Sequence, residues 1–112
     1  MVEKLYKPIL MDSIKAAVNV DKQRFIGFDG NYCTANAKAL GVSDVEIESG
    51  QFAPVAINGI LLIKTAGAIT KSSKVASDAN GFAVAYTTGE VNGYSLDDAA
   101  GSGEIIRIAR GI

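Results

Sequence analysis

Seven carboxylates have a side-chain type that could support acid–base chemistry or bind a cation: Asp29, Asp44, Asp78, Glu90, Asp97, Asp98 and Glu104. Two of them held close together could act as general acid and base, and several could ligate calcium. Most stand beside Gly, Ser or Asn, in turn-like contexts where a short acidic side chain bonds its own backbone. The spacing of a calcium-binding loop is absent. We therefore interpret these carboxylates as turn residues, and keep an enzyme with paired carboxylates only as a third hypothesis.

Other reactive groups are scarce. The sequence has no histidine and a single cysteine, Cys33, which excludes Ser-His-Asp and Cys-His arrangements, zinc sites of the ordinary kind and an intrachain disulfide. We predict that Cys33 is a small buried apolar side chain. The glycines of Gly101-Ser102-Gly103 precede a strand-like run instead of the helix that a phosphate-binding loop needs, so they predict a turn. We predict a protein that is not an enzyme and that has no metal and no cofactor.

The charge balance argues against two classes of partner. The formal net charge is −1, and basic residues such as Lys71, Lys74, Arg107 and Arg110 are scattered along the chain. No broad positive field is expected, so we predict no nucleic-acid partner and no membrane partner. The longest apolar run, Ile60 to Ile63, is far too short to span a bilayer, and the N-terminus lacks a signal-peptide core. We expect synthesis in the cytoplasm of the producing cell.

Turn dipeptides organise the chain. Four of them favour tight turns: Asp29-Gly30, Asn58-Gly59, Asn80-Gly81 and Asn92-Gly93. The segments between are rich in β-branched and aromatic residues, which predicts strands in Arg24 to Phe28, Val55 to Ile57, Ile60 to Ile63, Phe82 to Tyr86 and Ile105 to Ile108. We interpret Ile57-Asn58-Gly59-Ile60 as a two-residue hairpin, and Val45 with Ile47 as the dry face of a strand.

Helix signals are weak. Asp12-Ser13 could cap a short helix over residues 14–18, and residues 96–100 could form a second one. The sequence therefore predicts an all-β (mainly β) fold: a small barrel or sandwich of short antiparallel strands, with an N-terminal arm and at most one or two short helices. With apolar residues at 48% and charged residues at 21%, the composition is that of one soluble globular domain.

An internal echo suggests two similar β units. Asp29-Gly30, Leu40-Gly41 and Ser49-Gly50-Gln51 are followed about fifty residues later by Asn80-Gly81, Asn92-Gly93 and Ser102-Gly103-Glu104. We expect residues 1–22 to form an N-terminal arm, a first strand or a short helix. Residues 23–112 are expected to form the compact β domain, with the two units over about 24–60 and 75–110.

The order of motifs resembles the capsid-cement, or head-decoration, family of tailed bacteriophages and prophages. The resemblance rests on Ala68-Ile69-Thr70, Ser77-Asp78-Ala79-Asn80-Gly81, Gly93-Tyr94-Ser95-Leu96-Asp97-Asp98-Ala99 and Gly103-Glu104-Ile105-Ile106-Arg107-Ile108. It is strong in the C-terminal half and looser from Leu40 to Ile60. Two positions depart from the family pattern, with serine at 72 or 73 where Gly is usual and Ser95 where Ala is usual.

The resemblance implies a structural virion protein that binds the outer surface of an assembled capsid and stabilises it. Its implied partners are the major capsid protein and other copies of itself, most simply in a trimer. For capsid or subunit contact we single out Leu5, Tyr6, Pro8, Ile9 and Leu10, an apolar stretch that can lie extended against another subunit. The same stretch could equally be the first strand of the body.

A second function class stays open. A carbohydrate- or receptor-binding β module of a virion surface would use Tyr86, Tyr94 or Tyr32 as a stacking surface. Capsid binding and glycan binding by the purified protein would separate the two hypotheses.

Overall fold

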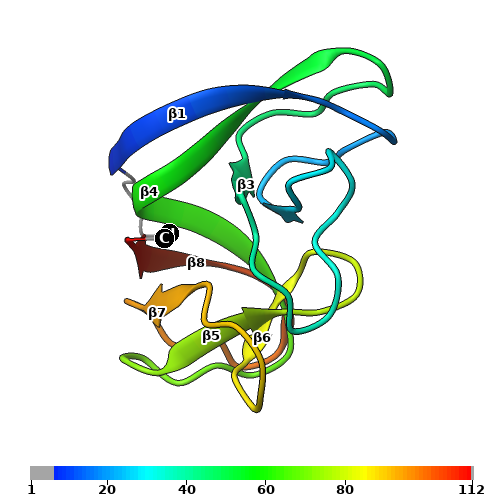
Figure 1. Cartoon of the computed structure of the whole chain (residues 1–112). Helices are drawn as coiled ribbons and strands as arrows, with labels where there is room; N and C mark the ends of the chain where they lie inside the picture. Colours follow the sequence, from blue (N-terminus) through cyan, green and yellow to red (C-terminus); the bar gives the residue numbers. More distant parts are fainter. Residues whose placement is uncertain (1–6, 112) are drawn as a thin grey trace.

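The computed structural model describes residues 7–111. These residues form eight β-strands, joined by loops, and no helix. The strands are β1 (Lys7–Lys15), β2 (Phe25–Ile26), β3 (Gly41–Ser43), β4 (Phe52–Ala66), β5 (Lys74–Ser77), β6 (Ala83–Ala85), β7 (Gly93–Ser95) and β8 (Ser102–Arg110) (Figure 1). All but one of the pairings between them are antiparallel. The predicted all-β fold class is confirmed.

Five of the strands close into a barrel. Their order is β4–β6–β5–β7–β8, and β8 pairs back with β4. The exceptional parallel contact is at Thr65 of β4, which pairs with Ala83 of β6. Closure removes the free edges that these short strands would otherwise expose to water.

The long strand β4 joins the barrel to the remaining strands. Its first part pairs with β1 along one edge and with β3 along the other, while Gly59 to Ala66 pair with β8. Figure 1 shows β4 as the green strand that runs from β1 down to β8. Because β4 passes straight through Asn58 and Gly59, the predicted two-residue hairpin at this point is wrong.

Gly59 allows β1 and β4 to approach closely instead of forming a turn. Its φ is +111°, and a Cβ there would lie 2.3 Å from the carbonyl oxygen of Lys7 in β1. The pairing register of β1 and β4 shifts twice beside it, so that Ile9 and Ile57 have no paired partner. The Asn-Gly signal therefore marks a close, irregular approach of two strands instead of a chain reversal.

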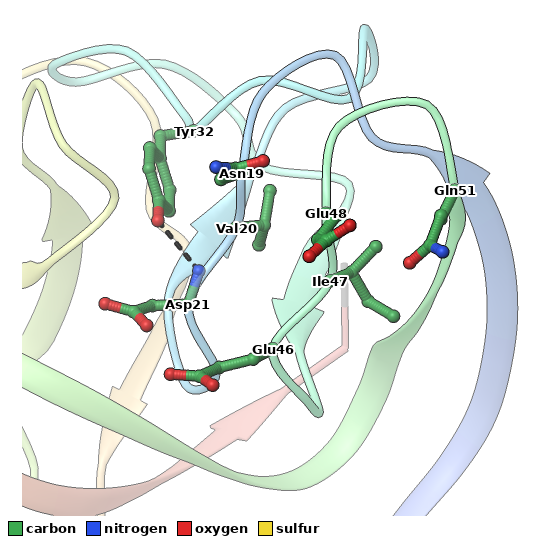
Figure 2. A pocket seen from close by; sticks show the side chains of 8 residues that line it. All are labelled: Asn19, Val20, Asp21, Tyr32, Glu46, Ile47, Glu48 and Gln51. Atoms are coloured by element: carbon green, nitrogen blue, oxygen red, sulfur yellow. Dashed lines mark hydrogen bonds between the residues drawn. The ribbon is translucent and has the colours of Figure 1, made fainter.

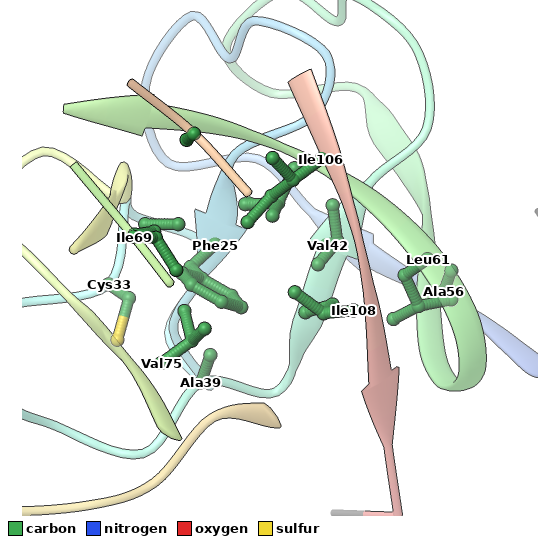
Figure 3. Close-up of a cluster of buried hydrophobic side chains, with 13 residues drawn as sticks. Phe25, Cys33, Ala39, Val42, Ala56, Leu61, Ile69, Val75, Ile106 and Ile108 are labelled. Carbon is green, nitrogen blue, oxygen red and sulfur yellow. The ribbon is translucent and has the colours of Figure 1, made fainter. Parts of the chain in front are cut away.

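The main core fills the barrel. Buried side chains of β2, β3, β4, β5 and β8 converge around Phe25, together with loop residues such as Cys33 and Ile69 (Figure 3). Phe25, Ile63 and Ile108 are fully buried, and each contributes about 1.5–3 kcal/mol to folding. Cys33 is buried as predicted, and burial raises the pKa of its thiol.

A smaller cluster lies beside the barrel. Ala16, Val20 and Ile26 are buried there, with Ile14 and Ile47 packed against them. A bridge between Val20 and Ile47 joins the two loops that contribute to the cluster. Ile47 is therefore partly buried as predicted, but Val45 is 41% exposed and lies outside any strand. The predicted strand with both side chains on its dry face is wrong, because only one bridge forms there.

Two buried arginines, Arg24 and Arg110, connect segments that are distant in the sequence by donating hydrogen bonds to backbone carbonyl oxygens. Nη1 of Arg110 donates hydrogen bonds to the carbonyl oxygens of Leu40 and Ile57, both at 2.8 Å, and Nη2 donates to Ala39 O. Burial lowers the pKa of Arg110 to about 10, so the side chain remains charged at neutral pH. The end of β8 is thereby fastened to β4 and to the segment before β3.

Arg24 connects the segment before β2 with the 78–82 turn. Its guanidinium carbon lies 3.8 Å from the ring centroid of Phe82 and 4.2 Å from that of Tyr32. Nε and Nη2 both donate to Asn80 O, at 3.0 and 2.8 Å. A desolvated cation between two rings is worth about 2 kcal/mol, so Arg24 holds the 78–82 turn against the segment before β2.

Both predicted helices are wrong for the same physical reason. Residues 12–15 continue β1, where Ile14 pairs with Ala53. In the other segment Ala99 bridges Ile69, and the Asp97 carboxylate accepts hydrogen bonds from the backbone and side chain of Arg107. Helices of one or two turns are marginal by themselves, and here strand pairing and side-chain bonds satisfy the same backbone groups.

Candidate functional site

The outer strand β1 is the most exposed element of the described structure. Seven of its nine residues are exposed, and the other two, Pro8 and Ile14, are half-buried. Its apolar side chains include Ile9, which is 82% exposed, Leu10 at 49% and Met11 at 39%. Within residues 7–111, β1 pairs only with β4, so its second edge carries unpaired backbone groups. An apolar strand with a free edge is a surface to which another chain can add.

Phe52, at the start of β4, is a further exposed apolar side chain beside β1. It is 67% exposed and pairs with Lys15 at the far end of β1. Ile9, Leu10, Met11 and Phe52 together are called the β1 surface below. Figure 1 shows β1 arching over the top of the molecule, away from β5, β6 and β7.

The structure places three of the five predicted contact residues on this strand. Pro8, Ile9 and Leu10 are consecutive residues of β1, whereas Leu5 and Tyr6 lie outside the described residues. Sequence reasoning missed Met11 and Phe52. Met11 could have been found by extending the apolar stretch by one residue, but no local signal distinguishes Phe52 from a core phenylalanine.

The three predicted stacking tyrosines have separate environments. Tyr32 already makes internal contacts on its ring and its hydroxyl. Arg24 covers the ring, and the hydroxyl accepts a hydrogen bond of 2.8 Å from the amide of Asp21. Tyr86 donates its hydroxyl hydrogen to Gly89 O at 3.1 Å, and Lys74 lies over its ring. Tyr94 is 49% exposed on β7. Tyr86, directly after β6, and Tyr94, on β7, flank Lys74 of β5, while Tyr32 is elsewhere.

The carboxylates singled out in the sequence are spread over separate turns. Asp78 accepts hydrogen bonds from the amides of Asn80 and Phe82, both at 2.9 Å. Glu104 accepts from the amides of Ala100 and Gly101. Asp29 bonds Asn31, which lowers the pKa of that carboxyl. These bonds are internal turn contacts of the kind the sequence predicts.

One hollow of the described structure has an acidic lining. Its volume is about 600 Å³, and Figure 2 shows its lining residues: Asn19, Val20, Asp21, Tyr32, Glu46, Ile47, Glu48 and Gln51. Among residues 7–111, no group of three or more Cys, Asp or Glu side chains is arranged to hold a metal ion. The same residues contain no helix of the length and apolarity needed to cross a membrane.

Comparison with known proteins gives the family. A family model described as phage cement protein matches residues 7–110. The chain belongs to the phage cement proteins. It is therefore a structural virion protein associated with the capsid, as the motif order predicts. A search of curated proteins gives no match for this cement protein.

A solved structure has the same fold. The crystal structure of the head fiber gp8.5 N base in bacteriophage phi29 superposes on this cement protein with a TM-score of 0.74. The two sequences are 17% identical, and the alignment covers 91% of this chain and 93% of that one. At this identity the likeness establishes the shared fold.

Proposed function

We propose that this cement protein binds the outer surface of the assembled capsid through its β1 surface and ties neighbouring major capsid protein subunits together. The observation that carries the proposal is the exposure of Ile9, Leu10 and Met11 on a strand with a free edge. Family membership supports the capsid as the partner. The virion exterior is then its place of action, after synthesis in the host cytoplasm.

The exposed strand is best explained by a partner. Edge strands of soluble monomers are usually short, charged or covered, because a free apolar edge promotes aggregation. β1 has nine residues, and its centre is apolar. Burial of Ile9 in a contact would contribute up to about 2 kcal/mol, and Leu10 and Met11 would add to it. A partner strand could also satisfy the backbone groups of the free edge.

Stabilisation follows from mass action. A protein that binds the assembled shell and not its separate subunits stabilises the shell by RT ln(1 + [L]/Kd), about 4 kcal/mol per site at a thousandfold excess over Kd. The function requires no catalysis, and we propose that none occurs. The internal turn bonds of Asp78 and Glu104 support this.

We further propose a trimer of this protein, because a ring-closing contact places three copies around a capsid threefold axis. Light scattering of the free protein at micromolar concentration tests it. A trimeric mass is expected, and a strictly monomeric particle both in solution and on the shell would contradict it.

Cosedimentation with expanded capsids that lack the protein tests the β1 surface. We expect the Ile9→Asp/Leu10→Asp double variant to lose at least about a hundredfold in affinity, because a buried hot spot is replaced by two desolvated charges. Phe28→Asp is the matched control, since Phe28 is 61% exposed but lies outside β1. It should bind like the parent protein. Equal binding by the double variant would refute the assignment, provided that its thermal unfolding is unchanged.

A further inference from the structure

Three side chains form a row across neighbouring strands on the outer face of the barrel. Lys74 of β5 pairs with Tyr94 of β7. On its other side, the amide of Tyr86 donates a hydrogen bond of 3.2 Å to Lys74 O, directly after the Val75–Ala85 pair of β5 and β6. Directly paired residues of adjacent strands have their side chains on the same face of a sheet, so Lys74 lies between two tyrosines.

The row is preorganised and accessible. The Lys74 ammonium lies 5.4 Å from the ring centroid of Tyr86, whose hydroxyl is held by Gly89 O. Lys74 is exposed, and Tyr94 is exposed over about half of its surface. On β8, the residue paired with Tyr94 is Ala109. Its side chain is small and covers little of the tyrosine ring.

A hollow of about 220 Å³ adjoins Tyr94, and its lining includes a second lysine, Lys38. Its lining includes Lys38, Asn92, Tyr94 and Arg110, and among residues 7–111 it includes no Asp or Glu side chain. Lys38 Nζ donates a hydrogen bond of 3.0 Å to Val91 O, which holds the ammonium in the lining. The tyrosine ring therefore has Lys74 as its strand neighbour and Lys38 in the adjoining hollow.

We propose that this face binds an anionic saccharide, with Tyr94 as the stacking surface and Lys74 and Lys38, each beside Tyr94, as the cations that attract its acidic groups. The C–H face of a pyranose ring packs against an exposed aromatic ring, as other flat ligands do. Two lysines beside Tyr94, with no Asp or Glu side chain among the described lining residues, favour a negative ligand over a neutral one. The small, polar surroundings suit a sugar better than the apolar side chains of a protein partner.

The position of this face makes it compatible with the β1 surface. Strands β4 and β8 separate β7 from β1 in the sheet order. Figure 1 shows β5 and β7 in the lower part of the molecule, with β1 at the top. A copy attached through β1 would leave Tyr94 and Lys74 available to a second ligand. Saccharide binding is measured on the free protein, so its failure would not affect the capsid proposal.

A glycan array carrying uronate-, sialate- and phosphate-bearing glycans, each matched with its neutral backbone, is the first test. We expect acidic glycans to be bound above their neutral counterparts. An array on which no acidic glycan exceeds its neutral counterpart would overturn the proposal.

Titration calorimetry with the strongest acidic glycan then tests the residues. We expect Tyr94→Ala to lower the affinity at least about tenfold, and Tyr94→Phe to retain it because the ring is kept. Lys74→Gln and Lys38→Gln should each weaken binding severalfold and reduce its dependence on salt. Polyglutamate controls for charge alone. If polyglutamate binds as tightly as the glycan, or if Tyr94→Ala binds like the parent, the site is not a saccharide site.

Discussion

The Nη1 atom of Arg110 lies 2.8 Å from the carbonyl oxygen of Leu40, a residue 70 positions earlier in the chain. The same nitrogen reaches Ile57 O, and Nη2 reaches Ala39 O. One side chain therefore satisfies three carbonyl groups that have few alternatives in a barrel with short strands. Its charge is retained in a buried site, and burial lowers its pKa to about 10.

Arg110→Met is expected to lower the free energy of unfolding by about 3 kcal/mol. Three carbonyl acceptors lose their donor, two of them buried and one part-buried. At about 1–3 kcal/mol for each buried acceptor, this outweighs the relief of no longer burying a charge. Urea denaturation followed by tyrosine fluorescence measures the change. Arg107→Met is the control, because Arg107 is more exposed and its ion pair with Asp97, at 2.9 Å, is open to solvent, so a clearly smaller loss is expected. Equal losses in the two variants would contradict the role given to Arg110.

Gly81→Ala and Gly50→Ala form a second matched pair. Both glycines have positive φ, +78° and +88°, so both substitutions introduce backbone strain of about 1 kcal/mol. A Cβ at Gly81 would also lie 2.4 Å from Phe25 O, whereas nothing lies within 4 Å at Gly50. We expect Gly81→Ala to be destabilised by at least about 2 kcal/mol more than Gly50→Ala. Thermal unfolding compares them, and similar melting temperatures would show that the close approach has little energetic weight.

Arg24→Met should destabilise the protein by about 2–3 kcal/mol. The substitution removes two hydrogen bonds to Asn80 O and the contacts with the rings of Tyr32 and Phe82. Tyr32→Phe keeps the ring and loses only the hydroxyl bond to the Asp21 amide, so about 1 kcal/mol is expected. Chemical denaturation distinguishes the two, and a larger effect for Tyr32→Phe would place the main contribution in the hydroxyl instead.

Cys33 should resist alkylation in the folded protein. Its side chain is 1% exposed, and burial raises the pKa of the thiol, so little thiolate forms at pH 8 and reagent has poor access to it. We expect iodoacetamide to react at least about a hundredfold more slowly than with the urea-unfolded chain. Mass spectrometry of timed samples measures both rates. Comparable rates would mean that the region around Cys33 opens freely.

Local sequence signals predicted the parts of the fold that depend on interactions between residues close together in the chain. Asn80-Gly81 forms a turn with Gly81 at positive φ, Ile105 to Ile108 lie in β8, and Cys33 is buried. Composition and the spacing of turn dipeptides were enough for the all-β class. The division into an arm and two similar β units stays a prediction.

Errors arose where long-range pairing decides the outcome. Asn58-Gly59 has the sequence of a hairpin, yet β1 and β8 occupy opposite edges of β4 there and keep the strand continuous. The row of Lys74, Tyr86 and Tyr94 depends on the register of β5 with β6 and β7. No spacing along the chain encodes that register, because the three residues come from separate turns and strands.

The continuous course of β4 has a mechanical consequence. Tension applied to β1 along its length loads the registered pairs from Lys7–Ile60 to Lys15–Phe52 in shear, and β4 passes the load directly to β8 inside the barrel. In this direction many bonds must rupture together, whereas peeling from one end would break them in sequence. A capsid partner bound at β1, as proposed above, and pulling along the strand would load the molecule along this resistant axis.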